Sequence, residues 1–110
     1  MTEKVAKYLS DIQLAISLID EFLVGIENFT IYQSDKKTQS AVERQLGIIG
    51  EAVNKIRQEE TEVLSQTKQI VDFRNRIIHS YDNIDATIVW VIIKKYLPIL
   101  KNEVDRLFKI

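Results

Sequence analysis

The chain has few residues of several types, and each shortage excludes a class of protein. It contains no cysteine, so disulfide frameworks and thiolate metal sites are excluded. A single histidine, His79, cannot supply the several imidazole ligands of a typical zinc site. We therefore expect a metal-free protein without a cofactor. Only three glycines and one proline are available for turns, which favours long helices.

Long apolar runs and a charge excess are also missing. No run approaches the ~18 residues of a membrane span, and the N-terminal residues do not resemble a secretory signal. We therefore expect a cytoplasmic protein without membrane contact. The formal net charge is −1, so any contact with RNA must be local. We interpret the cations of the last predicted helix as its solvated face rather than an RNA track: Lys94, Lys95, Lys101, Arg106 and Lys109.

The spacing of apolar residues predicts helices in the first half of the chain. A helix from Thr2 to Glu27 carries one stripe at alternating spacings of four and three: Val5, Leu9, Ile12, Ile16, Ile19, Leu23 and Ile26. The pattern breaks between residues 28 and 35. A second helix, from Asp35 or Lys36 to Gln58, carries the next stripe: Val42, Leu46, Ile49, Val53 and Ile56.

Two further helices are predicted in the second half. The third is shorter, with Ser65 as a possible N-cap, and ends at Asp82. The fourth is broadly apolar and begins after Asp85, which is suited to capping it. Pro98 should kink this helix, because its ring removes the hydrogen bond to the carbonyl of Lys94. With no strand pattern in the chain, we expect an all-α, four-helix bundle forming a single domain, residues 1–110.

Two glycines lie inside the second predicted helix. Gly47 and Gly50 each cost roughly 1 kcal/mol relative to alanine at such positions. The usual compensation is the close approach of another helix backbone. We therefore interpret both as packing glycines at a helix interface.

The segment Arg74-Asn75-Arg76-Ile77-Ile78-His79-Ser80-Tyr81 is the strongest candidate for a functional site. A histidine can move a proton near neutral pH, and arginines can hold anionic oxygens. Acid-base catalysis on a phosphodiester needs this combination. Taken singly, these residues have structural interpretations: a helix-capping histidine, solvated arginines and a packed tyrosine. It is their combination that favours a nuclease site.

Helix geometry raises the question of how these side chains meet. On an ideal helix His79 lies about 140° round from Arg74 and only about 40° from Asn75. Arg74 can join His79 if its side chain bends round, if the helix loosens near Ser80, or if a second copy contributes it. Cleavage by the RNA 2′-hydroxyl also needs both a base and an acid, and one histidine cannot easily hold both roles. A twofold dimer would supply two copies of His79, with Arg74 and Arg76 stabilising the phosphate charge.

The same residues resemble a known family. The spacing of Arg74, His79 and Tyr81 resembles the Arg-x4-His-x-Tyr motif of HepT-like toxins. These toxins are a branch of the HEPN (higher eukaryotes and prokaryotes nucleotide-binding) superfamily. The run 41–52, which ends in Ile-Gly-Glu-Ala, is similar to a segment of that branch. Ile88-Val89-Trp90 followed by Leu97-Pro98 is similar to its last helix. The resemblance therefore covers nearly the whole chain.

The resemblance implies an up-and-down HEPN-like bundle that forms a twofold homodimer, and a metal-independent endoribonuclease toxin of a type VII-like toxin-antitoxin pair. Arg74 and His79 would be catalytic, with Asn75 and Arg76 in support. The substrate would be RNA rather than DNA. The partner would be a minimal nucleotidyltransferase antitoxin that transfers AMP from ATP to Tyr81. A larger assembly of the dimer with this antitoxin is left open.

One alternative belongs to a different functional class. The chain could be a non-catalytic helical dimer that binds a nucleotidyltransferase or a nucleotide, with the motif kept as a docking and modification surface. The fold alone does not separate the two hypotheses.

Overall fold

In the computed structural model, the described residues are 2–59, 64, 71–72, 75 and 84–108, and all the regular elements among them are helical. They are α1 (Glu3–Phe22), α2 (Phe29–Gln33), α3 (Lys36–Glu59), α5 (Ala86–Val91), the π-helical turn η1 (Ile92–Tyr96) and α6 (Leu97–Phe108). Val71, Asp72 and Asn75 are helical too. The remainder of the predicted third helix lies outside the described residues. The predicted all-α class is confirmed. None of the described helices is long and apolar enough to span a membrane.

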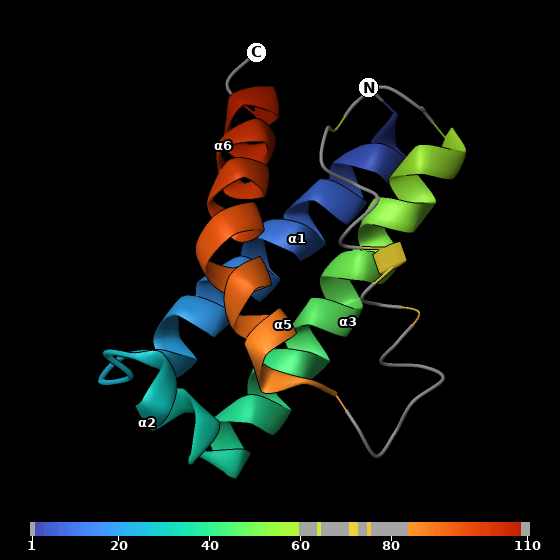
Figure 1. Cartoon of the computed structure of the whole chain (residues 1–110). Helices are drawn as coiled ribbons and strands as arrows, with labels where there is room; N and C mark the ends of the chain where they lie inside the picture. The colour runs from blue at the N-terminus through green and yellow to red at the C-terminus, as the bar shows by residue number, and fades with distance from the viewer. Residues whose placement is uncertain (1, 60–63, 65–70, 73–74, 76–83, 109–110) are drawn as a thin grey trace.

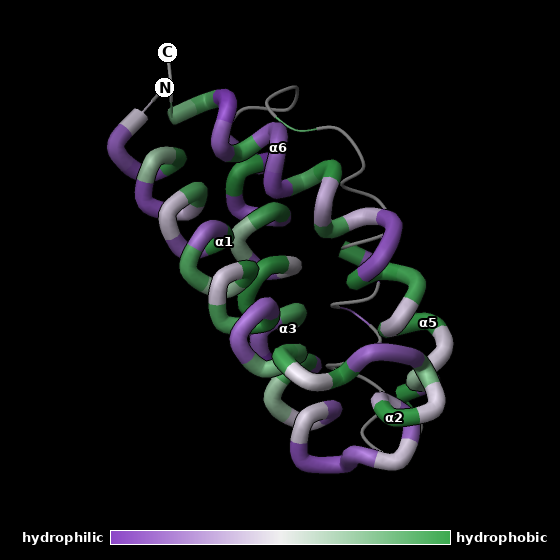
Figure 2. The backbone as a smooth tube through the Cα atoms, turned by 90° about the vertical axis from the view of Figure 1, so that its left-hand side faces the viewer, coloured by the Kyte–Doolittle hydropathy of each residue, from purple (hydrophilic) through white to green (hydrophobic). Residues whose placement is uncertain are grey.

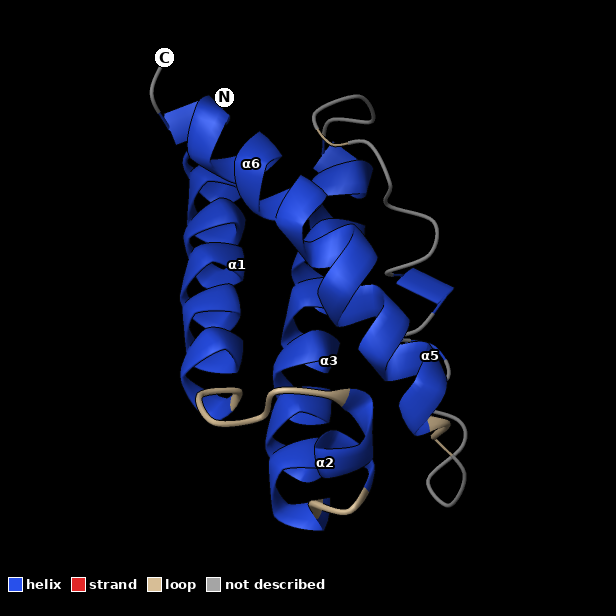
Figure 3. Cartoon of the chain, turned by 60° about the vertical axis from the view of Figure 1, so that its left-hand side comes forward, coloured by secondary structure: helices blue, strands red, loops and turns tan. Residues whose placement is uncertain are grey.

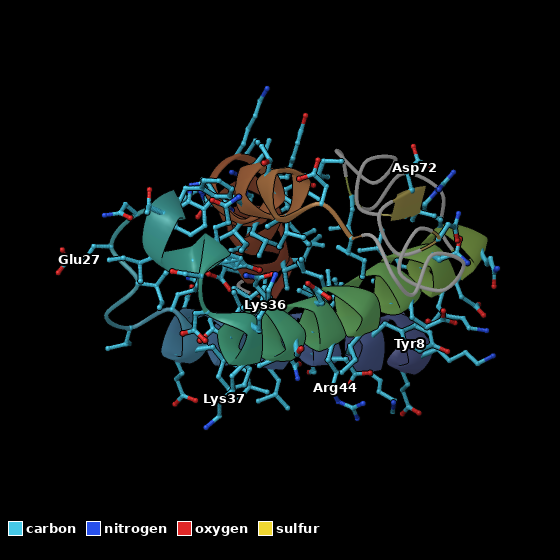
Figure 4. All side chains as sticks on the ribbon, turned by 60° about the horizontal axis from the view of Figure 1, so that its bottom comes forward. Tyr8, Glu27, Lys36, Lys37, Arg44 and Asp72 are labelled. Atoms are coloured by element: carbon cyan, nitrogen blue, oxygen red, sulfur yellow. The ribbon has the colours of Figure 1, made fainter. Side chains whose placement is uncertain are left out.

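Two antiparallel helices, α1 and α3, lie side by side, and α2 forms the corner between them (Figures 1 and 3). At the other end of the pair, Lys4 Nζ lies 3.5 Å from Glu59 Oε1. The elements α5, η1 and α6 follow one another directly along the chain, and we call these three elements the C-terminal rod. The rod packs on α1 and α2. Figure 4 shows the rod and Asp72 on the same side of α3.

The predicted apolar stripes supply the core. The inward face of each long helix is hydrophobic and its outward face is largely polar, as Figure 2 shows along α1 and α3. Burial of these side chains is the main source of folding free energy. The most buried core residues are Val5, Leu9, Ile12, Ala15, Ile19, Tyr32, Val42, Leu46, Ile49, Val53, Ile56, Val89, Leu100 and Val104.

The first helix is shorter than predicted. Thr2 caps its start, with the Val5 amide donating to Thr2 Oγ1 at 3.1 Å. The helix ends at Phe22 rather than Glu27, and Gly25 adopts a φ of 85°. Residues with a Cβ avoid this left-handed conformation, so the glycine marks where the chain leaves the helix. The apolar spacing continues past this point because Leu23 and Ile26 pack against the core from the loop.

A short helix, α2, occupies the segment in which the sequence pattern breaks. Asn28 caps it, since the Ile31 amide donates to Asn28 Oδ1 at 3.0 Å. The ring of Tyr32 is fully buried, and its centroid lies 5.3 Å from that of Trp90 on α5. This aromatic contact fixes the corner of the α1–α3 pair against the start of the C-terminal rod.

The predicted start of α3 is confirmed at Lys36, and Asp35 precedes it. The carboxylate of Asp35 accepts hydrogen bonds from the Thr38 amide at 3.0 Å and from the Thr38 hydroxyl at 2.6 Å. These hydrogen bonds, with the hydroxyl bond contributing most, lower the pKa of Asp35. A charged cap at this position also interacts favourably with the positive end of the helix dipole.

The last predicted helix is interrupted by a π turn. Asp85 caps it as predicted, with the Thr87 amide donating to Asp85 Oδ1 at 2.8 Å. The Leu97 amide then donates to the carbonyl of Ile92, five residues back. Pro98 follows directly, and a widened turn relieves the clash of a proline ring with the carbonyl four residues earlier. The predicted kink at Pro98 stays a prediction, as does the twofold dimer.

Candidate functional site

The structure describes one of the five predicted site residues. Asn75 is helical and its side chain is exposed. Arg74, Arg76, His79 and Tyr81 lie outside the described residues, so how they meet stays a prediction.

The described neighbours of Asn75 show which way this part of the chain faces. Val71 is buried, whereas Asp72 and Asn75 are exposed, as in an amphipathic helix with one side toward the core. Figure 4 shows Asp72 on the same side of α3 as the C-terminal rod. The side chain of Asn75 therefore lies on the solvent side of this helical segment.

The exposed charges are unevenly distributed over the described helices. On α1 the exposed acids are Glu3, Asp20 and Glu21. The C-terminal rod carries only cations at its exposed charged positions, and residues 86–102 contain no aspartate or glutamate. Cations also predominate at the exposed charged positions of α3, which are Lys36, Lys37, Arg44, Lys55, Arg57 and Glu59. The net charge of −1 therefore conceals basic surface on both elements, where a polyanion can bind locally.

Two lysines of η1 lie over aromatic rings, an arrangement that sequence reasoning missed. Lys94 Nζ is 4.7 Å from the centroid of the Trp90 ring, and Lys95 Nζ is 5.4 Å from that of the Tyr96 ring. Both distances are within the range of a cation–π interaction. The available signal was the four-residue spacing from Trp90 to Lys94, which puts both side chains on one helical face.

A separate polar groove of about 390 Å³ lies between α1 and α6. In its wall, the amide of Gln13 donates to Asp105 Oδ1 at 3.0 Å and Lys101 Nζ donates to Asp105 Oδ2 at 3.0 Å. The hydrogen bond from Gln13 to Asp105 joins the two helices, whereas Lys101 and Asp105 pair within α6. As for metals, the described part of the chain contains no group of three or more histidine, aspartate or glutamate side chains placed to hold an ion.

Comparison with known proteins identifies the family. The model of the "Ribonuclease HepT-like" family matches residues 12–107, a range that includes the whole segment 74–81. The chain belongs to this family. It is 38% identical over 104 residues to the probable ribonuclease HepT of Thermococcus cleftensis, covering 93% of this chain and 94% of that one.

A solved structure supports the fold assignment of this HepT-like chain. It is the tri-AMPylated Shewanella oneidensis HEPN toxin in complex with MNT antitoxin, which matches with a TM-score of 0.72 over 100% of both chains at 16% sequence identity. At that identity the likeness concerns the fold. The predicted all-α, four-helix, HEPN-like architecture is thereby confirmed.

Proposed function

We propose that this protein is a metal-independent endoribonuclease and the toxin of a HEPN/MNT pair. The main support is the family match over residues 12–107, which runs through the complete Arg74-x4-His79-x-Tyr81 motif. A histidine between cationic donors is suited to moving protons at a phosphodiester near neutral pH. The exposed Asn75 fits a polar supporting role beside them.

In the proposed reaction the 2′-hydroxyl of the substrate attacks the adjacent phosphorus. One His79 removes the hydroxyl proton, the bond from the 2′-oxygen to phosphorus forms, and the bond to the 5′-oxygen breaks. His79 of a second copy protonates the leaving 5′-oxygen. Arg74 and Arg76 stabilise the negative charge on the phosphoryl oxygens. The products are a cyclic phosphate and a free 5′-hydroxyl.

We also propose that the partner nucleotidyltransferase silences the enzyme by AMPylation of Tyr81. The phenol oxygen would attack the α-phosphate of ATP, forming a phosphodiester and releasing pyrophosphate. The attached nucleotide adds bulk and negative charge two residues from His79, and this charge repels the RNA phosphate. The structural neighbour is itself described as tri-AMPylated, which supports modification in this fold.

Cleavage by purified, unmodified protein tests the proposal. We expect cleavage of RNA that persists in chelator and falls by about 10²- to 10⁴-fold in His79→Ala. Lys7→Gln, a change at an exposed site on α1, is the matched control and should keep full activity. Intact mass recorded for each sample excludes inactivation by prior AMPylation. Absence of cleavage across varied RNAs would favour the non-catalytic adaptor instead.

Modification of Tyr81 has its own test. Incubation with ATP and the neighbouring nucleotidyltransferase should add AMP to the native chain and abolish its cleavage of RNA. Tyr81→Phe should stay active under the same conditions. Equal loss of activity in both proteins would place the silencing modification on another residue.

A further inference from the structure

The outward face of the C-terminal rod combines positive and apolar side chains. Within this face, Val91 is 44% exposed and Ile99 is 40% exposed. We call the face the outer stripe; its residues are Thr87, Val91, Lys94, Lys95, Pro98, Ile99, Asn102 and Arg106. It contains three cations and no carboxylate. Such a surface attracts a polyanion along its whole length.

The two central lysines differ from three of the other lysines in the described part of the chain, whereas Lys36, Lys37 and Lys55 share their lack of an ion pair with a described residue. Lys4, Lys7 and Lys101 each make an ion pair with a carboxylate: Glu59, Asp11 and Asp105. Lys94 and Lys95 make no ion pair with any described residue and lie over the Trp90 and Tyr96 rings. An aromatic ring restrains an ammonium group without neutralising its charge. Both charges therefore remain available to an external anion.

The position of the stripe relates it to the proposed active site. The rod and Asp72, which lies three residues before Asn75, are on the same side of α3 (Figure 4). An RNA strand that reaches the motif on this side can extend along the rod. Attack by a 2′-hydroxyl also requires a strand that can leave regular A-form geometry, which favours single-stranded over paired RNA.

We propose that the outer stripe holds single-stranded RNA, with Lys94 and Lys95 binding consecutive phosphates. Val91 and Ile99 provide apolar surface for unstacked bases, which gives contact without sequence selectivity. The proposal rests on the ribonuclease function proposed above and adds where the substrate lies. It replaces our interpretation of these two lysines as an ordinary solvated face.

The test measures binding of labelled single-stranded RNA by fluorescence anisotropy. All proteins carry His79→Ala, so that the RNA stays intact. Lys94→Gln with Lys95→Gln should weaken binding about 20-fold at roughly 0.1 M salt. The slope of the logarithm of the binding constant against the logarithm of the salt concentration should fall by roughly 1.4, because two phosphate contacts on a single strand are lost. Lys94→Arg with Lys95→Arg should bind normally.

Lys4→Gln with Lys7→Gln is the matched control, because it removes the same charge from exposed positions on α1. It should leave the affinity and the salt slope unchanged. Equal weakening by both glutamine pairs would overturn the proposal and indicate an effect of net charge alone. Thermal unfolding of each variant confirms that it is folded.

Cleavage assays with native His79 separate this proposal from the proposed function. We expect the Lys94 and Lys95 glutamine pair to raise KM with kcat unchanged. If the native protein cleaves RNA and this pair alters neither KM nor binding, the ribonuclease stands and the RNA surface is wrong. If the native protein cleaves nothing, the proposed function fails, and the binding assay still decides the role of the stripe. The glutamine pair could also bind RNA normally and no longer co-elute with the nucleotidyltransferase. That result would assign the stripe to a protein partner and overturn the proposal.

Discussion

At the scale of single residues, Gln39 is the polar side chain on which the corner between α2 and α3 depends. It is only 7% exposed, and its Nε2 donates to the carbonyls of Tyr32 and Gln33, both at 2.8 Å. These carbonyls belong to the last residues of α2, and that of Tyr32 also accepts from the Asp35 amide at 3.1 Å. The Gln39 amide therefore donates to carbonyls at the end of α2 that water would bind at an exposed helix terminus.

Gln39→Glu should destabilise the fold at neutral pH. The change keeps the size of the side chain but replaces a donor with a carboxylate that faces two carbonyl oxygens. We expect the free energy of unfolding in urea to fall by about 3 kcal/mol. The loss should shrink as the pH is lowered, because the protonated carboxyl can donate again and the folded state raises its pKa.

The neighbouring exposed residue provides the control. Ser40→Glu adds the same charge on the solvent side of α3 and should change stability by less than about 0.5 kcal/mol. A similar loss in both variants would mean that repulsion along α3, rather than the amide contact, limits stability.

At the scale of elements, two glycines should respond in opposite ways to alanine. Gly25 has a φ of 85°, so Gly25→Ala should lower the free energy of unfolding by about 1 kcal/mol. Gly47 lies within α3, and a Cβ added there meets no atom of the described residues within 4 Å. Gly47→Ala should therefore raise the free energy of unfolding by about 1 kcal/mol.

The result at Gly47 also bears on the helix-interface interpretation. Since no atom of the described residues approaches it, none of the described helices explains Gly47 by a close approach. A second copy packed against α3 would reverse the effect. In that case Gly47→Ala would lower stability by an amount that depends on protein concentration, which urea unfolding at two concentrations would reveal.

The sequence predicted the long helices better than their ends and interruptions. The repeat of apolar residues located α1, α3 and the C-terminal rod, because side chains on one face must pack on one core. It extended α1 too far, since Ile26 belongs to the core without being helical. It missed α2 and η1, whose positions depend on the contact between Tyr32 and Trp90 and on the backbone before Pro98.

For the candidate site, the sequence predicts residue types but not their surroundings, and the site itself stays a prediction. The motif from Arg74 to Tyr81 could be recognised in the sequence because this combination of residue types and spacing is unusual. Its described member, Asn75, is exposed as a binding residue should be. The interpretation of Lys94 and Lys95 as a solvated face agrees with their exposure, but the sequence did not show that they lie over the Trp90 and Tyr96 rings.

At the scale of the whole molecule, the main prediction concerns how many histidines one active site needs. The chain has a single His79, yet cleavage through a 2′-hydroxyl needs a base and an acid. We proposed that two copies supply them across a twofold axis. If Arg74 instead reaches His79 of the same copy, each copy has an independent active site.

Subunit mixing distinguishes these arrangements. When native protein and His79→Ala are mixed in equal amounts and allowed to exchange, random pairing leaves about one quarter of the dimers with two histidines and half with one. If each site needs both histidines, activity should fall to about one quarter of that of the same total amount of native protein, whereas independent sites would retain about one half. Differently tagged copies that co-purify after mixing confirm the exchange. A value near one half would contradict the two-histidine mechanism while leaving the ribonuclease itself intact, since a single His79 would then have to take the proton from the 2′-hydroxyl and return it to the 5′-oxygen in turn.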